Sequence, residues 1–233
     1  MRGAWIQRTY QREMHRFYRE FIRDGDLVFD IGAHKGSRTE VYLRLGARVV
    51  AVEPQADCIA HLRQKYGDNP RFACFHGGVA DAVGEMPFYH SPSYPRVSSF
   101  LPEWRQVQRE IWKDHAWDAP QTVAVTTLDV LIAEYGLPAF IKIDVEGFEL
   151  QVLRGLSHPV PTLAFEATPT SEQIGRARAA MDHLQQIGRY TFNATPMYKT
   201  FRWLQPQWTD ADTIEAMLHD RTEQCDIYAR LGR

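Results

Sequence analysis

Short apolar runs alternate with amphipathic segments along most of the chain. The runs predict buried strands at residues 27–30, 47–52, 71–75, 122–126, 140–143, 162–165, 190–193 and 226–229, with a short added strand or hairpin at 85–90. The longer segments predict helices at residues 4–23, 37–45, 55–66, 103–115, 128–135, 148–154 and 172–187. This alternation is typical of α/β domains, in which helices cover a mostly parallel, doubly wound sheet.

The first predicted helix has one apolar face, because large apolar residues recur at helical spacing: Ile6, Tyr10, Met14, Phe17 and Phe21. Arginines line another face, which we expect to be solvated. We therefore expect residues 1–24 to pack as a helix on a single domain that spans residues 25–233.

An insertion of about residues 85–120 interrupts the alternation of strands and helices. It contains three of the six tryptophans: Trp104, Trp112 and Trp117. One interpretation makes the insertion a lid over an acceptor site. The other makes the tryptophans anchors that fix a helix to the core, and the sequence leaves both open.

Composition limits the classes of partner. The chain has 233 residues, of which 44% are hydrophobic and 24% charged, and its formal net charge of -2 gives no general attraction to nucleic acid or anionic lipid. No apolar run reaches the roughly 18 residues of a membrane span, and the N-terminus shows no signal-peptide pattern. Three widely separated cysteines without a C-x-x-C pair favour reduced thiols, so we expect a soluble, cytoplasmic protein.

The stretch at residues 27–36 contains the first candidate for ligand binding. Its apolar run ends at Asp30, and a turn with Gly32 and Gly36 leads into a helix. The G-x-x-x-G spacing fits neither the dinucleotide fingerprint nor the phosphate loop. A ligand without phosphates, such as S-adenosylmethionine, fits better, because Asp30 or backbone carbonyls can pair with its ammonium group. The alternative is a purely structural turn between strand and helix.

Further candidate cofactor contacts follow the second and third predicted strands. Glu53 lies roughly 20 residues past the glycine turn, where an acid accepts hydrogen bonds from ribose hydroxyls. The segment after the third strand lies beside the ligand in doubly wound domains, so Gly78, Val79 and Ala80 are candidate neighbours of the adenine. The alternative for Glu53 is a surface glutamate at the end of a strand.

The run IKIDVEGFEL at residues 141–150 resembles the signature of the FkbM-type methyltransferases. The turn at residues 30–36, the TTLD stretch at 126–129 and the closing CDIYA at 225–229 are also similar to members of that family. The resemblance covers roughly residues 25–230. By motif match it implies cofactor contact by Asp30, Gly32, Gly36, Glu53 and Asp144.

The resemblance also implies a fold and an activity. The fold is the class I, Rossmann-like fold of S-adenosylmethionine-dependent methyltransferases, with a seven-stranded, mostly parallel sheet whose last strand is antiparallel. The activity is methyl transfer, usually to a hydroxyl oxygen. Acceptors in the family are varied and include polyketides, sugars, glycolipids and other secondary metabolites.

Candidate catalytic residues follow the carboxyl ends of predicted strands and face one crevice: His34, Asp144, Glu146 and Glu166. His34 has an ordinary pKa of about 6.5, which suits proton transfer near neutrality, or else it shapes the cofactor pocket. Glu146 can be the general base if burial raises its pKa, or else it caps the following helix. Lys142, inside an apolar strand, is expected to pair with a neighbouring carboxylate.

Asp144 and Glu166 also offer oxygen ligands of the kind that Mg²⁺ prefers. The adjacent acid–amide pair that usually completes such a site is missing, because Ala167 and Thr168 follow Glu166. We therefore predict that the protein uses no metal.

The function that these residues favour is O-methylation of a hydroxylated small molecule, sugar or secondary metabolite. A nucleic-acid methyltransferase is the first alternative, and the acidic balance of the chain argues against it. A non-catalytic protein that binds S-adenosylmethionine is the second. The sequence leaves the oligomeric state open, with a homo-oligomer among the options.

Overall fold

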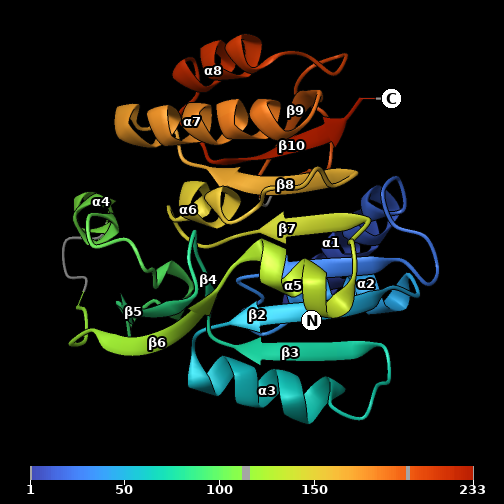
Figure 1. Cartoon of the computed structure of the whole chain (residues 1–233), viewed down its shortest axis with the longest axis vertical. Coiled ribbons are helices and arrows are strands. Elements are labelled where there is room, and N and C mark those ends of the chain that lie inside the picture. The colour runs from blue at the N-terminus through green and yellow to red at the C-terminus, as the bar shows by residue number, and fades with distance from the viewer. Residues whose placement is uncertain (1, 112–115, 198–199, 233) are drawn as a thin grey trace.

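The computed structural model describes residues 2–111, 116–197 and 200–232. They form a seven-stranded sheet, a three-stranded sheet and helices on both faces of the larger sheet (Figure 1). The strands are β1 (Leu27–Ile31), β2 (Arg48–Glu53), β3 (Phe72–His76), β4 (Gly78–Val79), β5 (Gly84–Phe88), β6 (Gln121–Thr126), β7 (Phe140–Ile143), β8 (Thr162–Ala167), β9 (Tyr190–Pro196) and β10 (Cys225–Leu231). The helices are α1 (Arg2–Tyr18), α2 (Ser37–Arg44), α3 (Ala56–Tyr66), α4 (Trp104–Ile111), α5 (Leu128–Tyr135), α6 (Glu149–Arg154), α7 (Ser171–Ile187) and α8 (Ala211–His219), with a 3-10 turn η1 (Pro95–Val97).

The large sheet has the strand order β3-β2-β1-β7-β8-β10-β9. Its inner pairs are parallel, whereas β10 pairs antiparallel with both β8 and β9. The strand order changes direction between β1 and β7, and ligands of open α/β sheets bind at such a switch point, outside the carboxyl ends of the strands. This topology confirms the predicted class I, Rossmann-like fold with an antiparallel last strand.

Both faces of the sheet are buried, because successive side chains along a strand point to opposite sides. Phe29 and Ile31 join the larger core with residues of α5, α6 and α7. Val28, which precedes Phe29 and points to the opposite side of the strand, joins a second core with α1 and α2. In Figure 1 α5, α6 and α7 lie in front of the sheet, and α1 and α2 lie behind it. Two-sided burial explains why the strands are nearly continuous apolar runs in the sequence.

Helix α1 packs on the back of the sheet through aromatic side chains. Tyr18 is fully buried, and its ring centroid lies 4.9 Å from that of Tyr42 and 5.5 Å from that of Phe140. The helix ends at Tyr18, earlier than the predicted residue 23, and the Asp26 carboxylate accepts a hydrogen bond from the Arg23 N–H at 2.7 Å. No helix of the described residues is long and apolar enough to cross a bilayer.

The predicted insertion contributes to a small sheet of order β4-β6-β5, in which β6 pairs parallel with β4 and antiparallel with β5. Trp104, at the start of α4, is only 1% exposed. A Cβ at Gly147 would lie 2.7 Å from Trp104 Cε3, so the indole rests directly on the turn that precedes α6. These contacts support the anchoring interpretation for Trp104. Trp112 lies outside the described residues.

The sequence did not predict the short strand β4, the 3-10 turn η1 or helix α8. Helix α8 occupies part of the chain between residues 193 and 226, where the sequence was interpreted as a loop. Asp210 caps its N-terminus by accepting a hydrogen bond from the Thr213 N–H at 2.9 Å, and Ile214 and Leu218 are buried. An acidic N-cap followed by apolar residues at helical spacing was a readable signal for this helix.

Candidate active site

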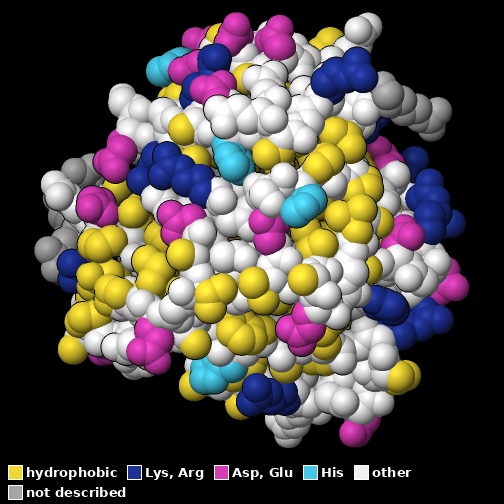
Figure 2. Space-filling model, viewed as in Figure 1, with side chains coloured by type: hydrophobic (Ala, Val, Ile, Leu, Met, Phe, Trp, Pro, Cys, Tyr) yellow, Lys and Arg dark blue, Asp and Glu magenta, His cyan; other side chains and the backbone are white. Residues whose placement is uncertain are grey.

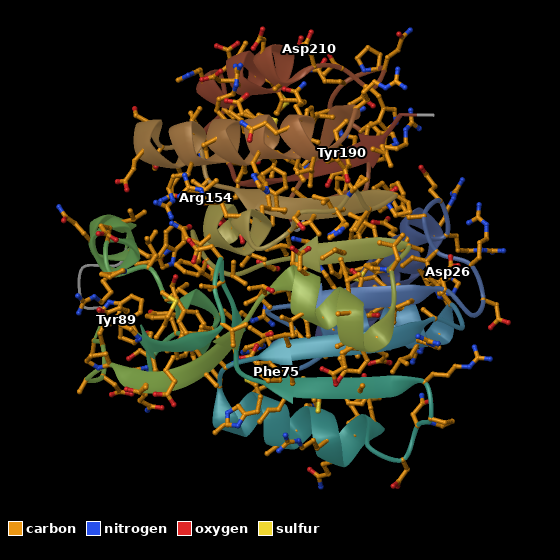
Figure 3. All side chains as sticks on the ribbon, in the orientation of Figure 1. Asp26, Phe75, Tyr89, Arg154, Tyr190 and Asp210 are labelled. Atoms are coloured by element: carbon orange, nitrogen blue, oxygen red, sulfur yellow. The ribbon has the colours of Figure 1, made fainter. Side chains whose placement is uncertain are left out.

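The candidate site lies where the parallel strands end. In Figure 1 the arrowheads of β2, β3 and β7 point toward the small sheet, and in Figure 3 Tyr89 lies on this side whereas Asp26 lies on the opposite side. The Asp144 N–H donates a hydrogen bond to the Ile31 carbonyl at 2.9 Å, which joins the ends of β1 and β7. Gly32 has a φ of 80°, and a Cβ there would collide with the Asp144 carbonyl oxygen. Glycine at this position therefore allows the two strand ends to approach closely.

Glu53, at the end of β2, fastens the glycine turn. Its carboxylate accepts hydrogen bonds from the backbone N–H groups of His34 at 2.7 Å and Gln55 at 2.9 Å. Burial raises the pKa of Glu53 to about 7, although these hydrogen bonds lower it. A carboxylate has lone pairs beyond those two, so the contact with ribose hydroxyls stays a prediction that the geometry permits.

Three of the predicted cofactor residues support the site from outside its cavities. Asp30 Oδ2 accepts a hydrogen bond from Thr39 Oγ1 at 2.6 Å, beneath the turn. Gly36 begins α2 with a φ of 76°, and a Cβ there would lie 2.6 Å from Leu62 Cδ2. Ala80 is buried and lines neither cavity described below. Direct contact of these residues with a cofactor stays a prediction.

A narrow cavity of about 50 Å³ lies between the glycine turn, the end of β2 and the small sheet. The predicted cofactor residues that line it are Gly32, His34, Glu53, Gly78, Val79 and Asp144. Phe100 of the insertion forms another wall, and a Cβ at Gly78 would lie 2.5 Å from its ring. The lining fits a nucleoside: it offers apolar walls for a base, a carboxylate for a ribose, and Gln55 Oε1, which is buried without a hydrogen-bond partner among residues 2–111, 116–197 and 200–232.

Three carboxyl groups meet at the ends of β7 and β8. One oxygen each of Asp144, Glu146 and Glu166 lies within 4.8 Å of the others. Burial would raise the pKa of Asp144, but the charges of Lys142 and Arg38 hold it well below its ordinary value. Burial and neighbouring carboxylates hold the pKa values of Glu146 and Glu166 well above theirs. The cluster therefore combines one carboxyl group whose ionised form is favoured with two whose protonated form is favoured.

A buried charge network fixes Asp144 from behind. Arg38 Nη1 donates to Asp144 Oδ2 at 2.6 Å, and Arg38 Nη2 lies 3.8 Å from Asp226 Oδ2. Lys142 Nζ lies 3.0 Å from Asp226 Oδ1, so Lys142 pairs with a carboxylate as its position in an apolar strand predicted. Paired charges are the form in which buried ions are tolerated. The network keeps Asp144 ionised and in one orientation.

Glu146 lies on a strained turn between β7 and α6. Its φ is 55°, a value that is uncommon for residues other than glycine and recurs at functional sites. The capping role that was the alternative for Glu146 belongs to Glu149, whose Oε1 accepts from the N–H groups of Val145 at 3.1 Å and Gly147 at 3.3 Å. The Glu146 side chain instead lines both cavities.

His34 also has a left-handed backbone, with a φ of 47°. Burial lowers the pKa of its imidazole to about 4, and the positive charges of Arg96 and Lys35 lower it further in the same direction. Its Nε2 is buried without a hydrogen-bond partner in the described residues. An imidazole with so low a pKa is a weak base, which favours the pocket-shaping role that the sequence left open.

A second, wider cavity of about 430 Å³ adjoins the first. The two share Gly32, His34, Arg96, Asp144 and Glu146. The remaining walls of the wider cavity come from α1, from the glycine turn and from the start of α2. Ligands in the two cavities would therefore meet beside the shared residues.

Several residues of the site were not predicted: Arg38, Arg96, Phe100, Glu149 and Asp226. Asp226 carried a readable signal, since a lone acid within an apolar strand needs a buried partner. The two arginines carried none, because arginine on a helix or in a turn-rich loop is usually exposed.

Part of the chain is similar to curated proteins that are called ribosomal RNA small subunit methyltransferase A. The one from Geobacter metallireducens is 37% identical over 82 residues, which are 35% of this chain and 30% of that protein. The one from Synechococcus sp. is 36% identical over 67 residues, which are 28% of this chain and 24% of that protein. The chain thus matches less than a third of the length of either relative.

Solved structures with a similar arrangement have low sequence identity to this chain. A precorrin-6y C5,15-methyltransferase from Geobacter metallireducens has 11% identity and a TM-score of 0.46, with 95% of this chain and 87% of that chain covered. Fibrillarin from Aeropyrum pernix, in complex with natively bound S-adenosyl-L-methionine, has 10% identity and a TM-score of 0.44, with 90% and 68% covered. Such values say nothing about the substrate of this chain.

The family model for the methyltransferase FkbM domain matches residues 30–220. This range begins at Asp30 on β1 and includes the glycine turn, the carboxyl cluster and the insertion. It covers most of the chain, and it agrees with the resemblance of the motif at residues 141–150. The chain therefore belongs to the FkbM family of methyltransferases, and its cofactor is S-adenosylmethionine.

Proposed function

We propose that this methyltransferase transfers the methyl group to a hydroxyl oxygen of a small molecule, sugar or secondary metabolite. The observation that carries the proposal is the boundary between the two cavities, where Gly32, Asp144 and Glu146 line both spaces. The narrow cavity offers contacts for a nucleoside. The wider one, at about 430 Å³, falls within the roughly 300–1,000 Å³ that is usual for small-molecule sites.

Bound S-adenosylmethionine supplies an electrophilic methyl group. The protein must align the acceptor and remove a proton from its hydroxyl. We assign the removal of this proton to Glu146, because Glu146 borders both cavities. A positioned general base typically raises the rate by 10²–10⁴-fold. Asp144 is ionised and favours a positive charge beside it. Glu166, which lies in the carboxyl cluster but lines neither cavity, supports these two groups.

We also propose that the reaction needs no metal ion. The carboxyl cluster offers oxygen atoms, but Arg38 and Lys142 already supply positive charge to Asp144. Free thiols at Cys58, Cys74 and Cys225 support a reducing, cytoplasmic location.

RNA is the rival acceptor, and the partial similarity to ribosomal RNA methyltransferases favours it. The net charge of -2 argues against it, since non-specific binding to nucleic acid depends on positive charge. On the face shown in Figure 2, acidic and basic side chains are interspersed and form no broad basic surface. A non-catalytic role is disfavoured by the acids at three strand ends: Glu53, Asp144 and Glu166.

Calorimetry and a methyl-transfer screen test the proposal. We expect wild type to bind S-adenosylmethionine or S-adenosylhomocysteine, and Glu53→Ala to weaken binding by about 1.5–3 kcal/mol, the scale of hydrogen bonds to a charged group. Thermal unfolding of each protein checks the fold. Binding of neither ligand, or tighter binding of NAD, would contradict the cofactor assignment.

The screen mixes the protein with hydroxylated metabolites and, separately, with short RNAs. Mass shift of the acceptor and release of S-adenosylhomocysteine detect methyl transfer, which should persist in the presence of a chelator. Methylation of RNA alone would contradict the proposed acceptor class, and loss of activity in the chelator would contradict the metal-free step.

A further inference from the structure

The wider cavity has an unbalanced charge. Its cationic lining residues are Lys35, Arg38 and Arg96. Arg38 is neutralised by its ion pairs with Asp144 and Asp226. Lys35 and Arg96 make no ion pair among the described residues, and the charges of both lower the pKa of His34. Two positive charges therefore face this cavity without a partner in the described part of the chain.

The acids that line the same cavity do not cancel these charges. The carboxylate of Asp144 already accepts from Arg38 at 2.6 Å. Burial and the charge of Asp144 hold the pKa of Glu146 well above its ordinary value, which disfavours a negative charge on Glu146. The imidazole of His34 is uncharged at neutral pH, because its pKa is about 4. The cavity is thus electropositive on the side of Lys35 and Arg96.

Two buried polar atoms of the cavity lack hydrogen-bond partners in the part of the chain that the structure describes. Gln11, on α1, donates through Nε2 to the Ser37 carbonyl at 3.3 Å, and this bond orients its amide. Its Oε1 is buried and has no hydrogen-bond partner among the described residues, and the same holds for His34 Nε2. Unsatisfied buried groups of this kind are costly and are usually completed by a ligand or water. A ligand that brings hydroxyl donors would satisfy Gln11 Oε1.

We propose that the wider cavity binds a small hydroxylated acid, with Arg96 and Lys35 holding its carboxylate or phosphate group and Gln11 accepting from one of its hydroxyls. The inference rests on the proposed function, because it names the chemical class of the acceptor. Lys35 lines only the wider cavity, whereas Arg96 lines both cavities. The pair is therefore a specificity device that places the anionic end of the acceptor and directs a hydroxyl toward Glu146.

Calorimetry on the protein saturated with S-adenosylhomocysteine measures the binding of matched ligands. The pairs are glucuronate and glucose phosphate against glucose, and p-hydroxybenzoate against p-hydroxybenzyl alcohol. We expect at least one acid to bind about 10-fold or more tightly than its neutral partner, because charge-assisted hydrogen bonds to arginine are strong. Comparison of glucuronate with glucose phosphate shows whether the cavity prefers a carboxylate or a phosphate group.

Substitutions of the two cations test which residues cause the preference for acidic ligands. Arg96→Ala and Lys35→Ala should each reduce it by about 10-fold and leave the affinity of the neutral partner unchanged, whereas Arg96→Lys should retain most of it. Arg63→Ala is the matched control, because Arg63 is an exposed cation on α3 that lines neither cavity. It should leave the preference intact.

Three results would overturn the inference: no acid binds more tightly than its neutral partner, the preference survives both alanine variants, or only a short RNA binds. Loss of S-adenosylhomocysteine binding in Arg96→Ala, with no effect of Lys35→Ala, would assign Arg96 to the cofactor and also overturn it. A wild type that binds no S-adenosylhomocysteine would instead contradict the proposed function.

Discussion

Glu146 combines a left-handed backbone with a carboxyl group whose pKa is raised by burial and by the charge of Asp144. Both features disfavour the folded state, and such strain recurs where a side chain must be aimed at a ligand. A raised pKa also makes the carboxylate a stronger base once it is ionised. His34 has the opposite property, since its pKa is lowered to about 4. The two candidate bases therefore predict different dependences of the rate on pH.

If Glu146 is the base, kcat at saturating substrates should rise with pH through the raised pKa of Glu146 and then level off. Glu146→Gln should remove this rise and lower kcat by about 10²-fold or more, while His34→Ala should have the smaller effect. Single-turnover methyl transfer across the pH range measures both. A wild-type profile that is flat above about pH 5, with activity abolished by His34→Ala, would assign the base to His34.

Sequence reasoning located the residues whose chemistry follows from strand ends. Gly32, Glu53 and Asp144 line the narrow cavity, because the carboxyl ends of adjacent parallel strands share one edge. The residues that it missed approach the site from elsewhere in the chain. Arg38 reaches Asp144 from a helix, at a sequence separation of 106 residues, and a single sequence shows no such pairing.

At the scale of elements, the sequence predicted the order of strands and helices through the doubly wound sheet, and it missed contacts between the insertion and the sheet. Trp104 was interpreted as lid or anchor with equal weight, and its contact with Gly147 depends on how α4 docks. The local sequence pattern predicts whether a segment is a helix or a strand. How that element docks depends on contacts with residues that are distant in the chain. Helix α8 is different, because its missed N-cap signal was local.

The insertion also forms part of the wall of the narrow cavity. The cavity volume of about 50 Å³ is smaller than the roughly 300–1,000 Å³ of most small-molecule sites. Phe100 rests on Gly78, and we expect its ring to move when a nucleoside enters. A side chain at Gly78 would press on the same ring and occupy the same wall of the cavity.

Gly78→Ala should therefore weaken S-adenosylhomocysteine binding by about 10-fold or more, since overpacking of this kind costs typically 1–3 kcal/mol. Gly84→Ala, in the same small sheet, has nothing within 4 Å of the new Cβ and should bind normally. Calorimetry compares the two variants, with Phe100→Leu added to Gly78→Ala to relieve the contact. Equal affinities for the two glycine variants would show that Phe100 does not gate the cofactor.

At the scale of the whole molecule, the site contains several carboxyl groups whose pKa values are raised by burial. Burial raises the pKa values of Glu53 and Glu149 from 4.5 to about 7, and those of Asp30, Glu146 and Glu166 are also raised. Asp144 is the opposite case, because Lys142 and Arg38 lower its pKa. The two kinds of group make opposite contributions to the pH dependence of stability.

Glu53 and Glu149 bind protons more tightly in the folded than in the unfolded chain. Their contribution to stability is complete below about pH 4.5 and is lost as pH rises through about 7. Each shift corresponds to about 3 kcal/mol. The contribution of Asp144 is present above its unfolded pKa of about 3.9 and is lost only on acidification below it. The free energy of unfolding should therefore fall between about pH 5 and pH 8.

Urea unfolding of the wild type at several pH values in this window measures that fall. Glu53→Gln and Glu149→Gln should each flatten the dependence, because an amide does not titrate, and their effects should approach a sum if the two sites are independent. Asp210→Asn, at the exposed N-cap of α8, is the matched control and should leave the slope unchanged, since the pKa of Asp210 is lowered and its titration ends at lower pH. A wild type whose stability is constant or increases from pH 5 to pH 8 would mean that these carboxyl groups are ionised in the folded protein and that the site is more hydrated than its burial indicates.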